Sequence, residues 1–514
     1  MFFMTGPHQK ESNVLTNPRG WFIVSYGEER DMSLSEMCFL TAREVARMIR
    51  KKEISVRECM EAHLQQIEKV NPRVNAIVTM IPPEQALDAA TKADTLLARG
   101  EEPGPLHGLP VAHKDLVLTK GIRTTFGSRV FKDFVPGEDD LIVERFRNAG
   151  AITIGKTNTP EFGAGSQTFN EVFGETVNPY DRSKTCGGSS GGAAVALACG
   201  MLPIADGSDL GGSLRNPASF CNVVGFRPSP GRVPSWPRQA AWFPLAVQGP
   251  MARTVDDIAL ILTAIAGLDR RSPISIAEPG SIFAEPLNRD FKDVRIAWSM
   301  DLGGLPVDPE VTAAIDAQRH TFEGLGCITD EASPDFSDAD EIFHVWRAWH
   351  YELMFGELLK KHREELKDTV VWNIEKGTKL TGPEIGTAER KRTALYHRVR
   401  EFMETYEYMI MPVSQVPPFD LKQRYIEEIN GVKMHTYIDW MKSCYYISTI
   451  GNPAISVPCG FTSGGLPVGL QIVGRHHDDL GVLKLAHAFE NATDFERKNR
   501  HWRSEPLPAG GGVS

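Results

Sequence analysis

The chain has 514 residues, of which 41% are hydrophobic and 24% are charged, the composition of a globular protein with a sizeable core. The formal net charge is −10, and no segment collects the Lys and Arg that a phosphate backbone demands, which excludes nucleic acid as an expected partner. The eight cysteines form no CxxC pair, which argues against a zinc ribbon or a disulfide framework. The N-terminus lacks a signal-peptide pattern, and no apolar run reaches the roughly 18–20 residues of a membrane span, so we expect a soluble, cytoplasmic protein.

The first part of the chain predicts an extension followed by two helices. Residues 1–32 show no sustained periodicity, so we expect a loosely ordered N-terminal extension that ends at a second methionine. Thr41 with Glu44, and Ser55 with Glu58, form capping-box patterns. These two patterns predict helices that begin directly after Thr41 and Ser55.

From about 106 to 235, short apolar runs alternate with helical patterns, and glycine and serine crowd the junctions. The runs predict strands at 109–112, 151–155 and 202–205, and helices at 141–149 and 193–199. This alternation predicts an α/β sheet layered by helices. Functional residues in such folds tend to lie in loops at strand ends, so we expect the catalytic core here.

The second half predicts longer helices, and the end of the domain returns to strands. Helical patterns cover 309–326, 340–368 and 385–407, within a region of about 290–450 that we assign to substrate specificity. Strands are predicted at 454–457 and 468–473. No linker or repeat divides the chain, so we expect one domain over 33–505 and a flexible, glycine-rich tail at 506–514.

The segment 150–157 matches the Walker A pattern GxxxxGK[ST]. A phosphate-binding loop needs free amides, but Ile152, Thr153 and Ile154 are β-branched and are typical of a strand. Pro160 also interrupts the helix that should follow. The residues therefore disfavour nucleotide binding.

The segment 187–191 matches GxSxG, which would make Ser189 the nucleophile of an α/β-hydrolase-like esterase. A nucleophile elbow follows a buried strand, whereas residues 178–186 are polar and are broken by Pro179. We keep this interpretation as an alternative, beside a Gly/Ser loop without chemistry.

A third set of residues joins three separate segments, namely Lys114, Ser189 and Ser213. A lysine at the end of an apolar strand can be buried, and lowering its pKa by roughly three units takes about 4 kcal/mol. A neutral Lys114 could then accept a proton from Ser213 through the hydroxyl of Ser189. The glycines before Ser213 allow successive amides to converge, as an oxyanion hole requires.

These segments resemble the amidase signature family. The resemblance is carried by residues 187–198, 206–221 and 225–233, and further by 108–115, 155–163, 451–460 and 465–474. It extends over most of residues 33–490. It implies the fold of that family, a single large α/β domain whose mixed central β-sheet is covered by helices on both faces.

The resemblance also implies a Ser–cis-Ser–Lys triad. Ser213 would be the acylated nucleophile, Ser189 the relay that follows a cis peptide bond, and Lys114 the base. The residues implied around the triad are the oxyanion-hole amides of Leu210, Gly211, Gly212 and Ser213, the supporting residues Asp209 and Arg215, and the substrate-binding Gly163 and Gly165.

Two other groups near these motifs compete for a role. His113 stands before the lysine where many relatives carry a hydrophobic residue, but no acidic partner for it is evident in the sequence. The doublets at 476–479 consist of two histidines and two aspartates, and adjacent side chains point in different directions, so we expect solvated charges rather than a metal site. No metal and no organic cofactor are expected.

The function implied is hydrolysis of carboxamide C–N bonds in a small-molecule substrate. Six tryptophans offer apolar walls, and we expect one or two of them to touch a hydrophobic or aryl amide, ester or carbamate: Trp236, Trp242, Trp346, Trp349, Trp372 and Trp440. The A-type component of the tRNA-dependent amidotransferase looks very similar, so a glutamine-hydrolysing subunit that serves a partner protein is an alternative. A homodimer is an assembly that the sequence leaves open.

Overall fold

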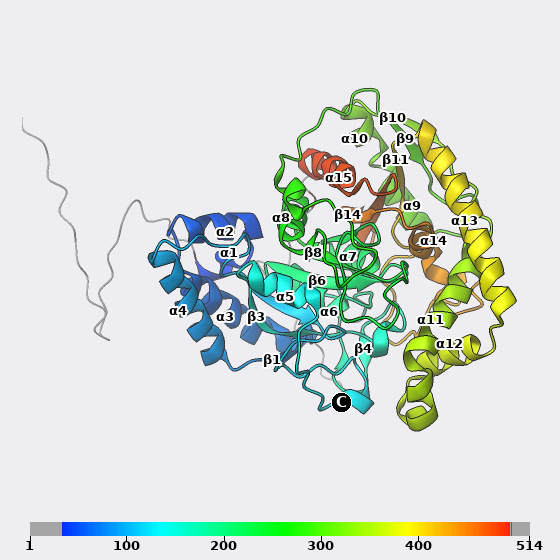
Figure 1. The fold of residues 1–514 in the computed structure, drawn as a ribbon. Helices are drawn as coiled ribbons and strands as arrows, with labels where there is room; N and C mark the ends of the chain where they lie inside the picture. The colour runs from blue at the N-terminus through cyan, green and yellow to red at the C-terminus, as the bar shows by residue number, and fades with distance from the viewer. Residues whose placement is uncertain (1–32, 494, 496–514) are drawn as a thin grey trace, which may run out of the picture.

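A computed structural model of the chain describes residues 33–493 and 495 (Figure 1). The predicted extension at 1–32 and the predicted tail at 506–514 lie outside the described residues. Both capping boxes are present, and they begin helices α2 (Ala42–Arg50) and α3 (Val56–Val74). Within the described residues, no helix is both long enough and apolar enough to cross a membrane.

The centre of the fold is a mixed eight-stranded sheet. In spatial order its strands are β10 (Ile328–Glu331), β9 (Arg295–Trp298), β11 (Tyr408–Pro412), β15 (Pro467–Gly474), β14 (Ala454–Phe461), β7 (Val224–Arg227), β8 (Val247–Ala252) and β6 (Ile204–Asp209). The first three run parallel to one another, and every later pair is antiparallel.

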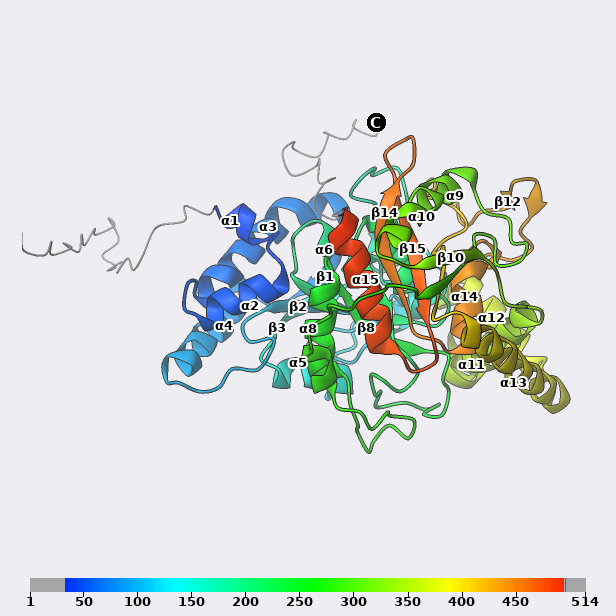
Figure 2. The ribbon, with the colours of Figure 1, turned by 90° about the horizontal axis from the view of Figure 1, so that it is seen from above.

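Alternate residues of the central strands enter two different cores. On β11, Ile410 packs into one core, whereas Met409 and Met411 pack into the other, because successive strand side chains point to opposite faces. The first core is covered by α8 (Val255–Ile265), α9 (Pro309–Asp316), α10 (Arg319–Gly324) and α15 (Asp479–Thr493). The second is covered by α11 (Ala339–His362), α13 (Gly382–Thr405) and α14 (Lys442–Ile450), on the other side of the sheet in Figure 2. The predicted fold class is confirmed.

A smaller sheet lies beside β6, at the edge of the large one. Its order is β1 (Ile77–Met80), β3 (Ile152–Thr157) and β2 (Pro110–Lys114), and β2 packs directly against β6. The helices around it are α1 (Leu34–Met37), α2, α3, α4 (Pro83–Ala98), α5 (Leu141–Asn148) and α6 (Gly191–Ala198). Helices α1–α4 lie on the opposite side of the molecule from α11–α13 (Figure 1).

The predicted long helices differ from the structure in their bounds. The stretch 309–326 is two helices, α9 and α10, and a further helix, α12 (Asp368–Thr378), packs against α11. Helix α7 (Arg215–Cys221) follows the loop after β6. The remaining short elements are η1 (Arg129–Phe131), η2 (Glu161–Gly163), β4 (Phe169–Asn170), β5 (Gly174–Glu175), η3 (Gly280–Ala284), η4 (Arg363–Glu365), β12 (Glu428–Ile429), β13 (Val432–Lys433) and η5 (Asp439–Met441).

Candidate active site

Lys114 is the last residue of β2, and its side chain is fully buried between the two sheets. Its Nζ lies 2.8 Å from Ser189 Oγ and 2.8 Å from Ser190 Oγ. Ser208 on β6 adds its hydroxyl at 3.1 Å and its carbonyl at 3.4 Å. The amine is therefore surrounded by neutral oxygen atoms and forms no direct ion pair with a described residue.

Burial controls the protonation of this amine. Desolvation lowers the pKa of Lys114 from its ordinary 10.5 to about 7, although the carboxylates of Asp209 and Asp206 act in the opposite direction. At neutral pH a large fraction of the amine is therefore uncharged. An uncharged amine has a lone pair and can accept a proton, as a general base must.

Ser189 lies in the loop that leads into α6, and the Gly188–Ser189 peptide bond is cis. The loop is held by polar contacts on both sides, because Ser166 Oγ donates to the Gly188 carbonyl and the Ser190 amide donates to the Ser213 carbonyl at 3.2 Å. No strand directly precedes this loop, as the polar residues 178–186 predicted. The strand that a nucleophile elbow requires is thus absent from this part of the described chain.

Ser213 lies on the turn between β6 and α7, and its side chain borders the same cavity as Ser189. Its hydroxyl makes no hydrogen bond to a described residue, so the oxygen is open to a bound molecule. The sequence-predicted residues Lys114 and Ser189 are in direct contact. The hydroxyls of Ser189 and Ser213 border the same cavity, but no hydrogen bond joins them among the described residues; the two loops are connected instead by the Ser190 amide, which donates to the Ser213 carbonyl.

The amides of the turn fall into two groups. Those of Leu210, Gly211 and Ser213 donate no hydrogen bond to a described residue, whereas that of Gly212 donates to Asp209 Oδ1 at 2.8 Å. A donor already bonded to a carboxylate is not free for an oxyanion. This geometry removes Gly212 from the predicted set of four amides.

Gly212 contributes instead by its conformation. Its φ is +123°, and an added Cβ would lie 2.6 Å from the Cys444 Cβ. A residue with a side chain would be strained there and would also collide with α14.

Asp209 and Arg215 form a fully buried ion pair beneath the turn. The Arg215 Nη2 lies 3.0 Å from Asp209 Oδ1, and Arg227 contacts the same carboxylate oxygen at 3.1 Å. Burial acts to raise the pKa of Asp209, but the two guanidinium groups hold it well below its ordinary value. The carboxylate thus stays charged and anchors the amides of Gly212 and Leu214.

The site opens into a cavity of about 770 Å³, a volume in the range of small-molecule pockets. Its wall near Ser189 includes five phenylalanines, Phe126, Phe131, Phe134, Phe162 and Phe355. Of the six tryptophans named above, only Trp236 lines the cavity; Trp242, for example, is 75% exposed, and Trp440 is buried elsewhere. The expected aromatic wall exists, but it is built mainly from loops at 116–163 and from α11 rather than from tryptophans after 230.

The two predicted substrate-binding glycines also border this cavity. Gly163 has a φ of +70°, and a Cβ added to it would lie 3.4 Å from Ser189 Oγ. Gly165 lies further along the same loop, near Tyr437 and Lys367. A substituent at Gly163 would therefore narrow the space directly beside the Ser189 hydroxyl.

His113 does have an acidic partner, and the sequence-based expectation that it lacks one is wrong. Its Nδ1 lies 3.0 Å from Asp206 Oδ1, and its Nε2 lies 3.1 Å from Thr153 Oγ1. The partner lies 93 residues away, on β6. His113 and Lys114 are adjacent on a strand and face opposite sides, so the imidazole is directed away from the serines.

The Walker A match is a strand, as its β-branched residues predict. Residues 152–157 form the central strand of the small sheet, and their amides are used between β1 and β2. Lys156 is buried and donates to the Val117 carbonyl and to Thr119 Oγ1. The lysine of the Walker A match is therefore engaged in structural hydrogen bonds.

The doublets at 476–479 are not simply solvated. His476 stacks on His477, whereas Asp479 is fully buried, accepts the Ser229 amide at 2.8 Å and pairs with Arg232 at 3.0 Å. The expectation of solvated charge is therefore wrong for Asp479, because the start of α15 folds onto the segment after β7.

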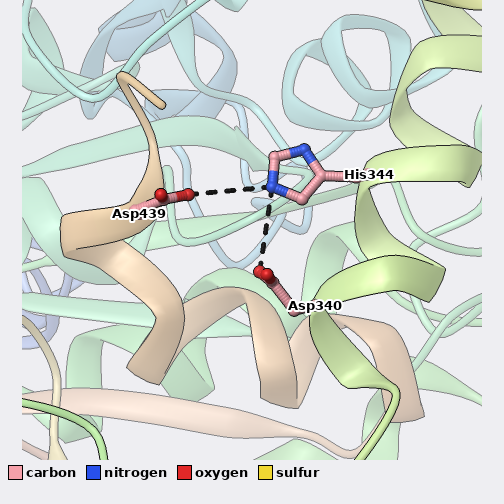
Figure 3. Close-up of side chains that lie close together, drawn as sticks. All are labelled: Asp340, His344 and Asp439. Carbon is pink, nitrogen blue, oxygen red and sulfur yellow. Dashed lines mark ion pairs between the residues drawn. The ribbon is translucent and has the colours of Figure 1, made fainter. Parts of the chain in front are cut away.

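A different cluster brings two carboxylates and an imidazole together. His344 Nε2 lies 3.7 Å from both Asp340 Oδ1 and Asp439 Oδ1 (Figure 3). Other groups already contact these carboxylates: Asp340 contacts Lys442 and the Tyr445 hydroxyl, and Asp439 Oδ2 accepts two backbone amides. These contacts give the carboxylates structural partners that join α11 to η5 and α14.

Three residues around the site were missed by reasoning from the sequence. Ser190 and Ser208 contact the Lys114 amine, and Arg227 completes the buried pair of Asp209 with Arg215. All three lie inside the motif segments used above. Their side-chain directions depend on how the loop and β7 pack, which the motifs do not specify.

The chain is similar to known amide hydrolases over most of its length. A family model described as Amidase matches residues 58–483. An acylamidase of Rhodococcus erythropolis is 37% identical over 465 residues, which cover 89% of this chain and 96% of that protein. The A-type component of the glutamyl-tRNA(Gln) amidotransferase of Geobacillus kaustophilus is 35% identical over 480 residues, covering 88% of this chain and 97% of that protein.

Solved structures agree with these relatives. A bacterial aryl acylamidase of the amidase signature family has a TM-score of 0.85 to this chain at 28% identity, covering 92% of this chain and 99% of that one. The chain therefore belongs to the amidase signature family and is a hydrolase of amide C–N bonds.

Proposed function

We propose that the protein is a serine amidase in which Ser213 is the nucleophile, Ser189 the proton relay and Lys114 the base. The observation that carries this proposal is the buried Lys114 amine, with its pKa lowered to about 7, which lies 2.8 Å from Ser189 Oγ; Ser189 and Ser213 border the same cavity. A general base with a pKa near neutral pH combines the right protonation state with a useful driving force.

The positions of the oxygen atoms around Lys114 support one orientation of its neutral amine, in which the nitrogen lone pair points toward Ser189 Oγ. A neutral amine has two N–H donors and one lone pair. Ser190 Oγ at 2.8 Å and Ser208 Oγ at 3.1 Å are placed to accept the two donors. The lone pair would then face Ser189 Oγ, so that Ser190 and Ser208 act as positioning residues for the base.

The reaction that follows conserves every proton. Lys114 takes the Ser189 proton while Ser189 takes that of Ser213, and Ser213 Oγ attacks the amide carbonyl. The oxyanion is stabilised by the free amides of Leu210, Gly211 and Ser213, each worth about 10²–10³ in rate. The relay returns the proton to the departing amine as the C–N bond breaks, and water then hydrolyses the ester on Ser213.

The cavity supports amides of hydrophobic or aryl groups as substrates. The rings of Phe162 and Phe355 pack at a tilt of 33° with centroids 4.4 Å apart, beside the loop that carries Gly163. Such a wall gains affinity from apolar and ring contacts. The relatives named acylamidase and aryl acylamidase point the same way. Esters and carbamates of similar shape are further candidates, because the acyl-enzyme chemistry is shared.

Labelling with a fluorophosphonate and peptide mapping tests the roles. We expect label on Ser213, loss of labelling in Lys114→Ala, and unchanged labelling in Ser463→Ala, which removes an exposed serine between β14 and β15. Label on Ser189 instead would favour the esterase alternative and overturn the proposed nucleophile.

The amidotransferase alternative rests on the 35% identity to the Geobacillus kaustophilus protein. Hydrolysis of simple aryl amides by the purified chain alone would argue against it. Glutaminase activity that appears only after a partner protein is added would favour it. The homodimer and the cytoplasmic location stay predictions, to be checked by light scattering and by fractionation.

A further inference from the structure

One face of α11 forms a wall of the cavity that changes from charged to apolar along the helix. The lining residues recur at helical spacing, in the order Arg347, His350, Tyr351, Met354, Phe355 and Leu358. From Arg347 to Leu358 the helix rises by about 16 Å, so the two ends of this wall contact different parts of a bound molecule. The apolar end meets the phenylalanines near Ser189, and Arg347 marks the other end.

Arg347 is only 4% exposed, and within the described residues it forms no ion pair. Its Nε donates to Asn373 Oδ1 at 3.0 Å, and its Nη2 lies 2.8 Å from the Tyr437 hydroxyl and 3.5 Å from that of Tyr351. Its Nη1 donates to no described residue. A guanidinium cannot lose its proton in a protein, so a full charge stands here with neutral partners and one unused nitrogen.

The groups that face this end do not balance the charge. Arg238 adds a second cation to the lining, and His350 is held neutral because burial, followed by Arg238 and Arg347, lowers its pKa to about 3. Two acids line the cavity: Asp209 is already paired with Arg215 and Arg227, and burial raises the pKa of Asp140 to about 7 against the effect of Arg238. Asp140 forms no ion pair with either arginine. This end of the cavity is therefore electropositive and short of an anion.

We propose that Arg347 binds a carboxylate of the substrate, so that the preferred amides carry an acidic group at one end and an apolar group at the other. This inference rests on the proposed amidase function and specifies its substrate class. A carboxylate would accept the unused Nη1 donors and supply the missing negative charge, which is the strongest kind of hydrogen bond available there. The rings of Tyr351 and Tyr437, with centroids 4.8 and 5.9 Å from the guanidinium carbon, hold the group in place.

Matched substrate pairs test this selectivity in the wild-type enzyme. Comparing succinyl-4-nitroanilide with pentanoyl-4-nitroanilide tests a carboxylate on the acyl side of the amide. Comparing 4-acetamidobenzoate with 4-methylacetanilide tests a carboxylate on the amine side. We expect kcat/KM to be about 10–100-fold higher for the acidic member of one pair, the range of a charge-assisted hydrogen bond. Equal or lower kcat/KM for both acidic members would overturn the proposal without touching the amidase assignment.

Variants locate the effect. Arg347→Met should remove the advantage of the acidic substrate and change kcat/KM of its neutral partner less than about threefold. Arg392→Met is a matched control, because Arg392 on α13 also lacks an ion pair among the described residues but lies outside the cavity. Equal losses on both members of a pair in Arg347→Met would show a merely structural role.

Binding separates this inference from catalysis. We would titrate the Ser213→Ala enzyme calorimetrically with 4-phenylbutyrate and with neutral 4-phenylbutanol, expecting tighter binding of the acid and a loss of that preference with added Arg347→Met. If Arg347→Met does not fold, Tyr437→Phe removes a hydroxyl that positions Nη2 and should weaken only the acid, by a few-fold. Acid binding without any amidase activity would sink the proposed function alone, whereas amidase activity without a preference for the acid would sink this inference alone.

Discussion

The residues around Lys114 and the wall formed by α11 are built in opposite ways. Lys114, Asp209 and Arg215 are fully buried and are held by several directional hydrogen bonds each. The apolar part of the α11 wall is held mainly by ring contacts, such as Phe162 against Phe355, and Phe355 itself is only partly buried. Hydrogen bonds fail when their geometry changes, whereas apolar packing tolerates substitution. Changes at the first region should therefore abolish hydrolysis, and changes at the second should redirect it.

The largest effect is expected at the serines. Ser213→Ala should lower kcat/KM for a neutral aryl amide by about 10⁴-fold or more, because no covalent intermediate can form. Ser189→Ala should cost less, about 10²–10⁴-fold, because only proton transfer is impaired. A larger loss in Ser189→Ala than in Ser213→Ala would reverse the roles and favour the elbow alternative.

Removal of the base should come next. Lys114→Met is expected to lower kcat by about 10²–10⁴-fold, with KM less affected, since the amine acts on the proton and not on binding. Lys156→Met is the matched control, because Lys156 is equally buried on the neighbouring strand but contacts Val117 and Thr119. Steady-state kinetics of both variants should separate them clearly; similar losses would point to general damage of the small sheet.

The buried ion pair should matter for stability more than any surface pair. Asp209→Asn leaves two buried guanidinium groups without their carboxylate and should reduce the free energy of unfolding by about 3–5 kcal/mol. Asp330→Asn breaks a pair with Arg295 on the exposed edge of the sheet and should cost about 0–1 kcal/mol. Denaturant unfolding of the two variants measures the difference, and equal costs would contradict the contrast drawn here.

The pH profile of kcat/KM should change slope near neutral pH. Lys114 must be neutral to accept a proton, and its pKa is lowered from 10.5 to about 7, so kcat/KM should fall about tenfold per pH unit below about 7. A limb near 10 would mean that the amine is not desolvated. The same shift affects stability: between about pH 7 and 10.5 only the unfolded state binds the proton, so the free energy of unfolding should rise with pH there. Lys114→Met should flatten that rise.

The smallest effect is expected on the apolar wall. Phe355→Leu should lower kcat/KM for aryl amides by about 3–10-fold and leave kcat/KM for acetamide nearly unchanged. The substitution removes one ring contact but leaves the catalytic residues intact. Phe283→Leu changes a buried phenylalanine far from the cavity and should leave the ratio of the two substrates as in the wild type. A loss of the same size on acetamide would place Phe355 in the catalytic machinery.

The parts of this protein that the sequence predicted well depend on neighbours along the chain. The capping boxes at Thr41 and Ser55 began helices as expected, since a cap and its partner are three residues apart. The strand predicted at 151–155 from its β-branched residues is present as β3 (Ile152–Thr157), although the same segment matches a phosphate-loop pattern. The fold class and the family followed from motif segments spread over most of the chain.

What the tertiary structure decided concerns pairs of residues that are far apart in sequence. Asp206 contacts His113 across 93 positions, the Gly212 amide of the expected oxyanion hole donates to Asp209, and five phenylalanines join Trp236 in the cavity wall. The motif identified Lys114 as the candidate base, but the burial of its side chain results from the packing of β6 against β2. Local patterns determine which backbone forms, whereas desolvation and charge pairing depend on what else fills the surrounding space, and only the folded chain specifies that.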